Sequence, residues 1–353
     1  MKILVINPGS TSTKIAVYEE ETPLLARNIR HSVDELAAYP HILDQFNFRK
    51  RLVLQELEAN GIPLHFDAVI GRGGLVKPIC GGVYEVNEAL KRDTEHAMRQ
   101  HACNLGSLIA ADLASTIPNC RAFMADPGVV DEREEVTHIS GSPLMPRITI
   151  WHALNQKAIA RRFAQEQGTR YENLNLVICH LGGGISVAAH QQGRAIDSNN
   201  ALDGEGPFSP ERTGTLPAGQ LVDLCFSGQL TKEEIKKRIC GRGGLAAHLG
   251  TTDVQAVVQS IEAGDEKARL VLDAMIYNVA KAIGAAATVL CGKIDAILLT
   301  GGIAHSDYII SHLKERIAFL APIHVYPGED EMLALAQNAI AALRGTRPIQ
   351  VYS

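Results

Sequence analysis

The sequence has few cysteines and no excess of basic residues, two features that mark specialised classes of protein. Its 353 residues include 7 cysteines, which are scattered and form no C-x-x-C pair. We therefore expect a reducing compartment, with neither a disulfide framework nor a zinc site. Lysine and arginine number 34 against 39 aspartates and glutamates, which gives a net charge of −5. Because nucleic-acid binders normally carry a basic excess, no nucleic-acid partner is expected.

Long apolar segments are also missing. The most apolar later stretch, residues 282–291, is too short to cross a bilayer and is bounded by Lys281 and Lys293. The chain reaches a polar turn after only six residues, which is too short for a signal peptide. A hydrophobic fraction of 46% and a charged fraction of 21% are those of a globular protein. We therefore expect a cytoplasmic protein with no membrane partner.

The chain is long enough for two domains that each bury a core. Near the start, strands are predicted at 3–6 and 15–18, joined by a turn of glycine and hydroxyl residues. The same order returns at 174–179 and 185–189, which indicates one distant duplication. Further strands are predicted at 68–70, 121–124 and 295–299, and helices at 35–60, 87–114, 151–167, 267–290 and 329–344. Breaks are expected in two of these helices, at Pro40 and at Gly106.

The first turn, Asn7-Pro8-Gly9-Ser10-Thr11-Ser12-Thr13-Lys14, is a candidate phosphate site. Its glycine lets the backbone approach a ligand, and its hydroxyl and N–H groups can donate to phosphate oxygens. Lys14 supplies charge, and Asn7 could hold a cation or a water. The segment is not a P-loop, because no Gly-Lys-Ser/Thr leads into a helix. The alternative is a polar hairpin turn without a ligand.

Two more glycine turns follow predicted strands. They are His180-Leu181-Gly182-Gly183-Gly184 and Thr300-Gly301-Gly302-Ile303. Two hairpins in different domains could hold the two ends of a triphosphate, and the third turn could let a nucleoside lie against exposed backbone. Each turn alone has an alternative as a simple packing turn. The ordered set of three is more specific than any one of them.

With these three segments the chain resembles the acetate/butyrate kinase family, within the superfamily of actin-like proteins, sugar kinases and heat-shock ATPases. The similarity extends over essentially the whole chain. It implies an α/β fold of two duplicated ribonuclease H-like (actin-like ATPase) domains, with mixed five-stranded sheets and an interdomain cleft. The domains implied are an N-terminal acyl-substrate domain, 1–147 plus 331–353, and a nucleotide-binding domain, 148–330. A homodimer or higher homo-oligomer is implied as well.

The activity implied is phosphoryl transfer between ATP and a small carboxylate, with Mg²⁺ as cofactor. The short chain and the loops at 140–143 and 204–214 are more similar to butyrate kinases than to acetate kinases. Butanoate is therefore the expected acceptor, giving butanoyl phosphate and ADP reversibly. Isobutanoate, propanoate and acetate stay open, because one methylene changes binding by only about 1–3 kcal/mol. The acceptor is already ionised at neutral pH, so the reaction needs alignment and positive charge rather than a strong base.

Four residues match the family's catalytic positions: Arg72, Asp126, His152 and Arg212. By resemblance, Arg72 contacts the substrate carboxylate and Arg212 stabilises the transition state, since arginine forks meet carboxylate and phosphoryl oxygens in pairs. Asp126 is expected to organise magnesium or polarise the acceptor, and His152 to hydrogen-bond the transferring phosphoryl group. The alternatives are an ordinary loop arginine at 72, an ion pair of Arg212 with a neighbouring acid, and a structural histidine at 152.

The remaining site residues also come from the resemblance. Asn7 and Glu331 are expected to hold Mg²⁺, although Glu329 and Asp330 are close enough to take that place, and such acids can instead cap a helix. The residues expected to bind the nucleotide are Asn7, Ser10, Ser12, Lys14, His180, Gly182, Gly183, Gly184, Asp253, Gly301, Gly302 and Ile303.

Two positions depart from the family pattern. Acetate kinases have Gly-Thr-Ser-His where this chain has Ala153-Leu154-Asn155-Gln156, so their second histidine is missing here. Gln255 stands where the family has an arginine near the adenosine. No role is therefore carried over to those two places.

Two other classes of protein fit the sequence less well. An actin-like ATPase switch would use the same hairpins without an acyl acceptor, but a pure switch has no need of a second anion site built from residues such as Arg72 and Arg212. A dinucleotide-dependent oxidoreductase is excluded, because no G-x-G-x-x-G follows the first strand.

Overall fold

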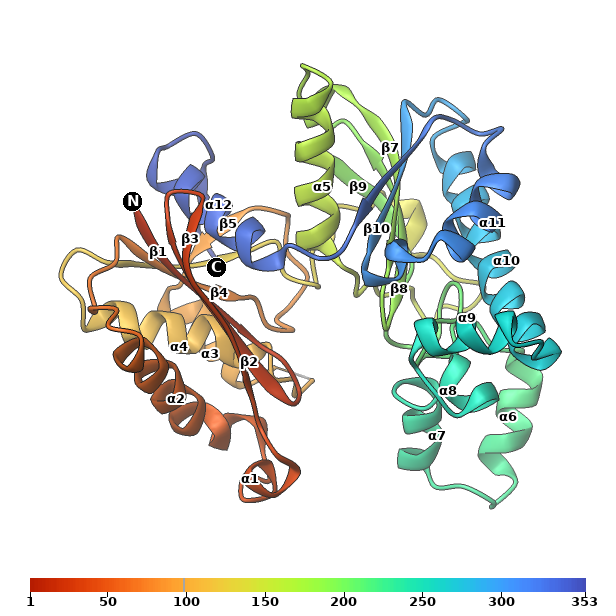
Figure 1. Ribbon diagram of the computed structural model, residues 1–353, viewed down its shortest axis with the longest axis horizontal. Helices are drawn as coiled ribbons and strands as arrows, with labels where there is room; N and C mark the ends of the chain where they lie inside the picture. The colour runs from red at the N-terminus through yellow and green to blue at the C-terminus, as the bar shows by residue number, and fades with distance from the viewer. Residues whose placement is uncertain (98) are drawn as a thin grey trace. The chain divides into compact units, whose positions relative to one another are not determined.

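The computed structural model describes residues 1–97 and 99–353. The chain is a mixed α/β protein that divides into two compact units, coloured by position along the chain in Figure 1. Unit 1 comprises Met1–Val130 and Asp330–Ser353, and unit 2 comprises Asp131–Glu329. The boundary expected from the sequence, between residues 147 and 148, falls within unit 2.

The described residues of unit 1 form seven strands and several helices. Its strands are β1 (Lys2–Pro8), β2 (Ser12–Glu19), β3 (Thr22–Arg30), β4 (Ala68–Arg72), β5 (Val83–Glu85), β6 (Arg121–Ala125) and β12 (Ile349–Gln350). Its helices are α1 (Val33–Ala37), the 3-10 helix η1 (Ile42–Gln45), α2 (Phe46–Ala59), α3 (Glu88–Glu95), α4 (Asn104–Ser115) and α12 (Glu331–Leu343).

Unit 2 is built in the same way with more helices. Its strands are β7 (Asn175–Leu181), β8 (Ile185–Gln191), β9 (Arg194–Ser198), β10 (Ala296–Gly301) and β11 (Ile323–Pro327). Its α-helices are α5 (Ala153–Glu166), α6 (Ala218–Phe226), α7 (Lys232–Ile239), α8 (Gly244–Leu249), α9 (Val254–Glu262), α10 (Glu266–Val289) and α11 (Asp307–Ile317). Its 3-10 helices are η2 (Glu135–His138), η3 (Tyr171–Asn173) and η4 (Gly302–His305).

The two sheets share one topology. In unit 1 the order is β12-β5-β6-β4-β1-β2-β3, and in unit 2 it is β11-β10-β7-β8-β9. In each, a central strand is antiparallel to the hairpin strand on one side and parallel to the next strand on the other. The predicted duplication and fold class are therefore confirmed. Unit 1 has a seven-stranded sheet rather than a five-stranded one, because β5 and β12 extend it beyond β6.

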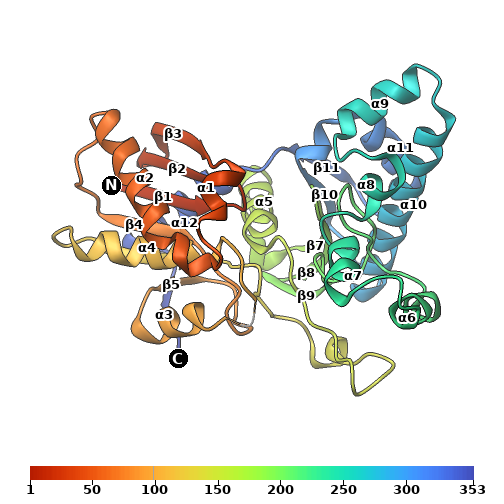
Figure 2. The same ribbon diagram turned by 90° about the horizontal axis from the view of Figure 1, so that it is seen from below.

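In unit 1, helices α2 and α4 cover one face of the sheet and α12 covers the other (Figures 1 and 2). Leu4 and Ile6 of β1 point to the α2 and α4 side, where they join the core. The intervening residues point the other way, since side chains alternate along a strand. The predicted break at Gly106 is wrong: this glycine lies inside α4, where a Cβ would stand 2.4 Å from the Arg72 carbonyl oxygen. The close approach of α4 to β4 requires the glycine, and the helix break falls before Asn104 instead.

In unit 2, the alternation of β7 sorts its side chains between two cores. Val177, Cys179 and Leu181 pack with α9, α10 and α11, whereas Leu176 and Ile178 pack with α5. Helix α10 is long and apolar enough to cross a membrane by length and composition alone, and 39% of its most apolar window is buried. Its residues Leu272, Val279 and Ile283 belong to the core, which is typical of a central helix in a globular unit.

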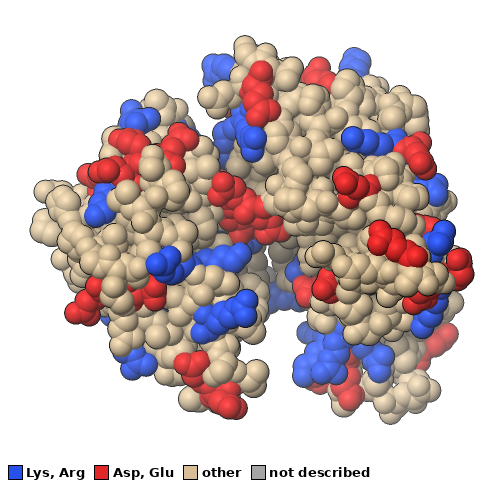
Figure 3. Space-filling model, in the orientation of Figure 1, with Lys and Arg blue, Asp and Glu red and all other residues tan. Residues whose placement is uncertain are grey.

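Charged side chains are mixed in sign over the surface that Figure 3 shows. Blue lysine and arginine groups and red aspartate and glutamate groups are interspersed among the described residues of that face. This distribution agrees with the small net charge of −5.

Candidate active-site residues

Three predicted residues of unit 1 meet at one edge of its sheet. In the parallel pairs of β1, β4 and β6, Ile6 lies beside Gly71, and Arg72 lies beside Ala125. Asn7 follows Ile6 in β1, Arg72 follows Gly71 in β4, and Asp126 follows Ala125 at the end of β6. All three therefore lie at the carboxyl ends of neighbouring strands. This is the usual place for ligand sites in α/β sheets.

Asn7, Arg72 and Glu331 form one polar cluster. Glu331 Oε2 accepts hydrogen bonds from Asn7 Nδ2 at 2.8 Å and from Arg72 Nη1 at 2.7 Å. Asn7 and Glu331 are buried, whereas the Arg72 side chain is 36% exposed. The cluster thus keeps a partly open guanidinium and two oxygen-bearing side chains together, a donor set that could hold an anion beside a hard cation.

Asp126 lies at the predicted edge but is fully buried. Its carboxylate forms an ion pair with Arg347 Nη2 at 3.2 Å, and its Oδ1 accepts from the Gly82 N–H at 2.8 Å. Its backbone has a φ of 38°, which is uncommon for a residue with a side chain. Arg347 also donates to Asn338 of α12. These contacts link β6 to the C-terminal segment, so Asp126 has a structural part in unit 1.

The first glycine turn is a tight connection between β1 and β2. The Gly9 N–H donates to the Ser12 carbonyl at 2.8 Å, and Asn7 lies opposite Lys14 in the strand register. Ser10 and Lys14 are exposed. The turn therefore presents a lysine and hydroxyl groups at the strand end that carries Asn7.

The second glycine turn joins β7 to β8 in unit 2 and is one residue shorter. The Gly182 N–H donates to the Gly184 carbonyl at 3.2 Å. His180 lies beside Thr300 of β10, which brings the Gly301 turn next to Leu181. Gly301 has a φ of 94°, and a Cβ there would stand 2.2 Å from the Leu181 carbonyl oxygen. The two predicted nucleotide turns of unit 2 are thus in direct contact.

His152 stands at the N-cap position of α5 and stacks on His180, with ring centroids 3.7 Å apart. Its Nδ1 lies 2.8 Å from Ser186 Oγ. That hydroxyl already accepts from Gln156 Nε2 at 2.9 Å and from the His152 N–H at 3.3 Å. Its own proton is then donated to His152 Nδ1, because a hydroxyl has one proton and two lone pairs. In the neutral ring this places the proton on Nε2, as a donor for an anion.

His180 is also held on both sides. Its Nδ1 lies 2.8 Å from Asn155 Oδ1, and its Nε2 lies 3.0 Å from Glu329 Oε1. These two contacts fix the orientation of the imidazole ring. Asn155 stands in the segment that replaces the family's second histidine.

The guanidinium of Arg212 lies close to Gly184 of the second glycine turn. Its Nη1 donates to the Ala201 carbonyl at 2.7 Å, and a Cβ on Gly184 would stand 1.9 Å from that nitrogen. Its contact with Glu211 is long, at 3.6 Å, so the alternative of a simple ion pair is weak. Arg212 Nε is buried without a hydrogen-bond partner among the described residues. The glycine is what lets the guanidinium reach the turn.

A pocket of about 850 Å³ collects the other predicted nucleotide residues of unit 2. Gly183, Asp253, Gly302 and Ile303 line it, together with Tyr308. Asp253 also caps α9 by accepting from the Ala256 N–H at 3.1 Å. The size suits a nucleoside, since small-molecule pockets measure roughly 300–1,000 Å³.

The three acidic residues at 329–331 have separate tasks. Glu329 contacts His180, Asp330 caps α12 by accepting from the Leu333 N–H at 3.2 Å, and Glu331 contacts Asn7. Among the described residues there is no group of three or more His, Cys, Asp or Glu side chains arranged for a metal. One carboxylate and one amide still fit Mg²⁺, which keeps most of its waters. Of the three, Glu331 is therefore the residue that fits the predicted metal role.

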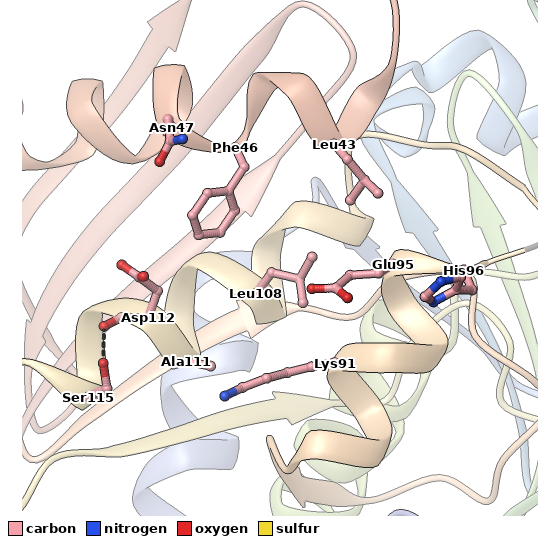
Figure 4. A pocket seen from close by; sticks show the side chains of 10 residues that line it. All are labelled: Leu43, Phe46, Asn47, Lys91, Glu95, His96, Leu108, Ala111, Asp112 and Ser115. Carbon is pink, nitrogen blue, oxygen red and sulfur yellow. Dashed lines mark hydrogen bonds between the residues drawn. The ribbon is translucent and has the colours of Figure 1, made fainter.

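A second pocket, of about 600 Å³, lies in unit 1 between η1, α2, α3 and α4 (Figure 4). Phe46, Leu108 and Ala111 form its apolar side, and Lys91 and Glu95 stand at its edge. Of the described residues that line it, none is a predicted site residue.

Sequence reasoning missed Ser186, Gln156 and Arg347. Ser186 carried one signal, since it follows the second turn in a strand whose neighbours are apolar. Gln156 and Arg347 carried none, because each acts through a partner 30 or 221 residues away.

The duplicated sheet with a glycine hairpin in each unit is the actin-like ATPase fold. Among solved structures, the fold is similar to an acetate kinase of Porphyromonas gingivalis, with a TM-score of 0.79 at 19% identity, covering 97% of this chain and 99% of that one. It is also similar to a propionate kinase of Francisella tularensis, with a TM-score of 0.76 at 18% identity, covering 96% and 98%.

Sequence comparison gives the family. Residues 148–327 match the acetokinase family. A protein of Bacteroides thetaiotaomicron named probable butyrate kinase is 78% identical over 352 residues, with 100% of both chains covered. One of the same name from Phocaeicola vulgatus is 55% identical over 352 residues, covering 100% of this chain and 99% of that one. The chain belongs to the acetokinase family, and the resemblance stated from its motifs is confirmed.

Proposed function

We propose that this protein is a butyrate kinase, which transfers a phosphoryl group reversibly between ATP and butanoate. The observation that carries the proposal is that each unit holds an arginine at a glycine-lined strand end, Arg72 in unit 1 and Arg212 in unit 2. Two anionic substrates need two such sites, and an ATPase switch needs only one. The names of the two relatives with 78% and 55% identity support butanoate as the acid.

In the proposed reaction a carboxylate oxygen of butanoate attacks the γ-phosphorus of ATP. A bond forms between that oxygen and phosphorus, the bond from phosphorus to the bridging β–γ oxygen breaks, and ADP leaves with the electron pair. No proton needs to move, because the acid is ionised. Catalysis is then positioning and charge stabilisation, as in other phosphoryl transfers.

We propose that unit 1 binds the acid and the transferring phosphoryl group. Arg72 would pair with the carboxylate, and Ser10, Ser12 and Lys14 would donate to phosphoryl oxygens. Mg²⁺ would be held by Asn7 and Glu331 and would neutralise charge on the phosphate oxygens when bound. Asp126 would keep this edge in place through its ion pair with Arg347.

We propose that unit 2 binds the nucleotide. His180 and Gly182 to Gly184 would hold the phosphate chain, while Asp253, Gly301, Gly302 and Ile303 would contact the nucleoside in the 850 Å³ pocket. Arg212 and His152 Nε2–H would donate to the phosphoryl group as its charge spreads. These roles use groups that are already held by other contacts, so little reorganisation is needed.

Two further properties are part of the proposal. A cytoplasmic location agrees with seven free cysteines and the kind of small, charged substrates involved. A homo-oligomer agrees with exposed apolar side chains of unit 2, since Leu144 and Phe226 are each 88% exposed.

The test is acyl hydroxamate formation from hydroxylamine, ATP and Mg²⁺ with acetate, propanoate, butanoate and isobutanoate. We expect hydroxamate with butanoate at least, and a higher kcat/KM for butanoate than for the other three acids. Highest kcat/KM with another acid would correct the substrate only. ATP hydrolysis without hydroxamate from any acid would overturn the kinase proposal in favour of an ATPase switch.

A further inference from the structure

Arg49 of α2 is the largest fully buried side chain of the protein among the described residues, and it lies directly behind the first glycine turn. Its exposed fraction is 0%. No carboxylate among the described residues forms an ion pair with it. A buried guanidinium without a counter-ion is costly and therefore unusual, so its contacts need an explanation.

Half of the hydrogen bonds of Arg49 go to carbonyl oxygens of the turn. Its Nη1 donates to the carbonyl oxygens of Gly9 and Ser12, each at 2.9 Å, and its Nη2 donates to that of Ser10 at 3.3 Å. The fourth carbonyl of the turn, that of Thr11, accepts from the His31 N–H at 2.9 Å. All four carbonyl oxygens of residues 9–12 thus accept a hydrogen bond. Arg49 supplies three of these bonds and His31 the fourth, and the Ser12 carbonyl also accepts from the Gly9 N–H.

This arrangement decides which way the amides point. In a trans peptide the C=O and the following N–H point to opposite sides. With the Gly9 and Ser10 carbonyls held by Arg49, the N–H groups of Ser10 and Thr11 point away from α2. No backbone partner for these two N–H groups is found within the described part of the chain. Two parallel donors on a turn are a common anion-binding device.

Arg49 is itself held in place by neutral groups. Gln45 Oε1 accepts from Arg49 Nε at 3.0 Å and from Nη2 at 2.9 Å. Thr13 Oγ1 accepts from Nη1 at 3.0 Å and lies 2.9 Å from His31 Nε2. Thr13 Oγ1 thus lies between Arg49 and His31, and neither Gln45 nor Thr13 brings a negative charge to the guanidinium. Burial, together with the charge of Arg49, lowers the pKa of His31. The positive charge of Arg49 is thus left uncompensated.

We propose that Arg49 is a positioning residue for phosphoryl transfer: it fixes the first glycine turn with its amides toward the transferring phosphoryl group and adds a buried positive charge behind it. This rests on the proposed function, in which that turn binds the phosphoryl end of ATP. Arg49 does not touch the substrate. It acts through Gly9, Ser10 and Ser12. Without Arg49, the carbonyl oxygens of these three residues would lose the guanidinium as a hydrogen-bond donor.

The test compares Arg49→Met and Arg49→Lys with Val53→Ala, a control that removes core volume from the same helix without touching the turn. All are assayed well below their melting temperatures. Arg49→Met should lower kcat about 100-fold or more, the effect of losing a preorganised donor. The KM for butanoate should stay within about threefold of wild type, because the acid is bound elsewhere. Val53→Ala should lose thermal stability with kcat unchanged.

Arg49→Lys keeps the charge but not the planar fork, so we expect a kcat between those of wild type and Arg49→Met. If Arg49→Met does not fold, the proposal is tested with Arg49→Lys alone. We then expect the kcat of Arg49→Lys to be about tenfold lower than that of wild type. A melting temperature that falls in either variant while kcat stays within twofold of wild type would overturn the proposal, since Arg49 would then be a scaffold residue only.

Calorimetric titration with MgATP and MgADP separates this inference from the proposed function, because it needs no acid. Arg49→Met should weaken ATP binding about tenfold and leave ADP binding within about twofold, since ADP lacks the phosphoryl group in question. If Arg49→Met weakened the binding of ATP and ADP equally, or of neither, the role of Arg49 would be overturned even if the protein is an active kinase. Selective loss for ATP would support it even if wild type formed no acyl phosphate, a result that would overturn the proposed function alone.

Discussion

Arg72 Nη1 donates to Glu331 Oε2 at 2.7 Å although the two residues are 259 positions apart in the chain. The pair joins the arginine expected to bind the substrate carboxylate to the glutamate expected to hold Mg²⁺. Asn7 donates to the same oxygen. A change at Glu331 should therefore affect the metal first and the acid second.

Glu331→Gln removes the carboxylate charge and leaves the size of the side chain. We expect the Mg²⁺ concentration for half-maximal rate to rise about tenfold or more, because carboxylate oxygens are the ligands that Mg²⁺ prefers. The KM for butanoate should change less, since Arg72 keeps its charge. Glu329→Gln is the matched control and should leave the Mg²⁺ dependence unchanged, because Glu329 contacts His180 instead. Equal Mg²⁺ effects in both variants would contradict this assignment.

Gly184→Ala should inactivate the protein through Arg212. The new Cβ would stand 1.9 Å from Arg212 Nη1, the flexible end of a side chain, so the arginine moves and the fold survives. We expect kcat to fall about 100-fold or more, as when an arginine that stabilises the transition state is lost. Adding Arg212→Ala to Gly184→Ala should cost little more. Gly284→Ala, where a Cβ meets nothing within 4 Å, should keep full activity. A fully active Gly184→Ala would show that the contact is unimportant.

Ser186→Ala should disturb His152 without unfolding unit 2. Gln156 Nε2 keeps its bond to the Ser186 carbonyl at 3.1 Å, but His152 Nδ1 loses the hydroxyl that fixes its tautomer. We expect kcat to fall about tenfold with both KM values near wild type, since a fixed proton donor acts mainly in the transition state. Ser186→Thr, which keeps the hydroxyl, should recover most of the rate. Unchanged kcat in Ser186→Ala would argue for a structural histidine.

The Asp126–Arg347 ion pair should be worth more to stability than an exposed pair. Asp126→Asn or Arg347→Met should each destabilise unit 1 by about 3–5 kcal/mol, because a buried charge loses its partner. The double variant should lose less than the sum of the two, since no unpaired charge remains. Urea unfolding measures all three. If Asp126→Asn lost activity at full stability, the catalytic role inferred from the resemblance would stand in place of the structural one.

Acidification should destabilise unit 2 through His190. Burial, together with the charge of Lys157, lowers the pKa of His190 well below its usual value. Below about pH 6.5 the unfolded chain takes up a proton that the folded chain does not, so stability falls as the pH falls, by up to about 1.4 kcal/mol per pH unit for this group. His190→Asn should show a smaller difference between pH 7.5 and pH 5.5 in urea unfolding. An equal pH difference in both proteins would exclude His190 as the cause.

The central strands of both sheets could be predicted because each is a buried apolar run ending in a turn signal. The strands at 3–6, 68–70, 121–124 and 295–299 all appear, with ends shifted by a few residues. Strand β3 was missed because most of its side chains are exposed. Strand β12 was missed because two residues carry no periodicity, and only pairing with β5 defines it.

The site shows the same division. Glycines and arginines at strand ends were visible in the sequence, because strand ends and turns are local features. Arg49 was not, since it stands among other polar residues of α2 and resembles part of a solvated surface. Its role depends on carbonyls 37 to 40 positions away, and nothing local signals that contact.

The most direct measurement runs the reaction toward ATP. Purified protein is mixed with ADP, Mg²⁺ and butanoyl phosphate, and ATP and free butanoate are quantified together over time. We predict one ATP formed for each butanoyl phosphate consumed, with the rate lost in Arg212→Ala. Butanoyl phosphate that stays unconsumed, in a preparation that still hydrolyses ATP, would contradict the account.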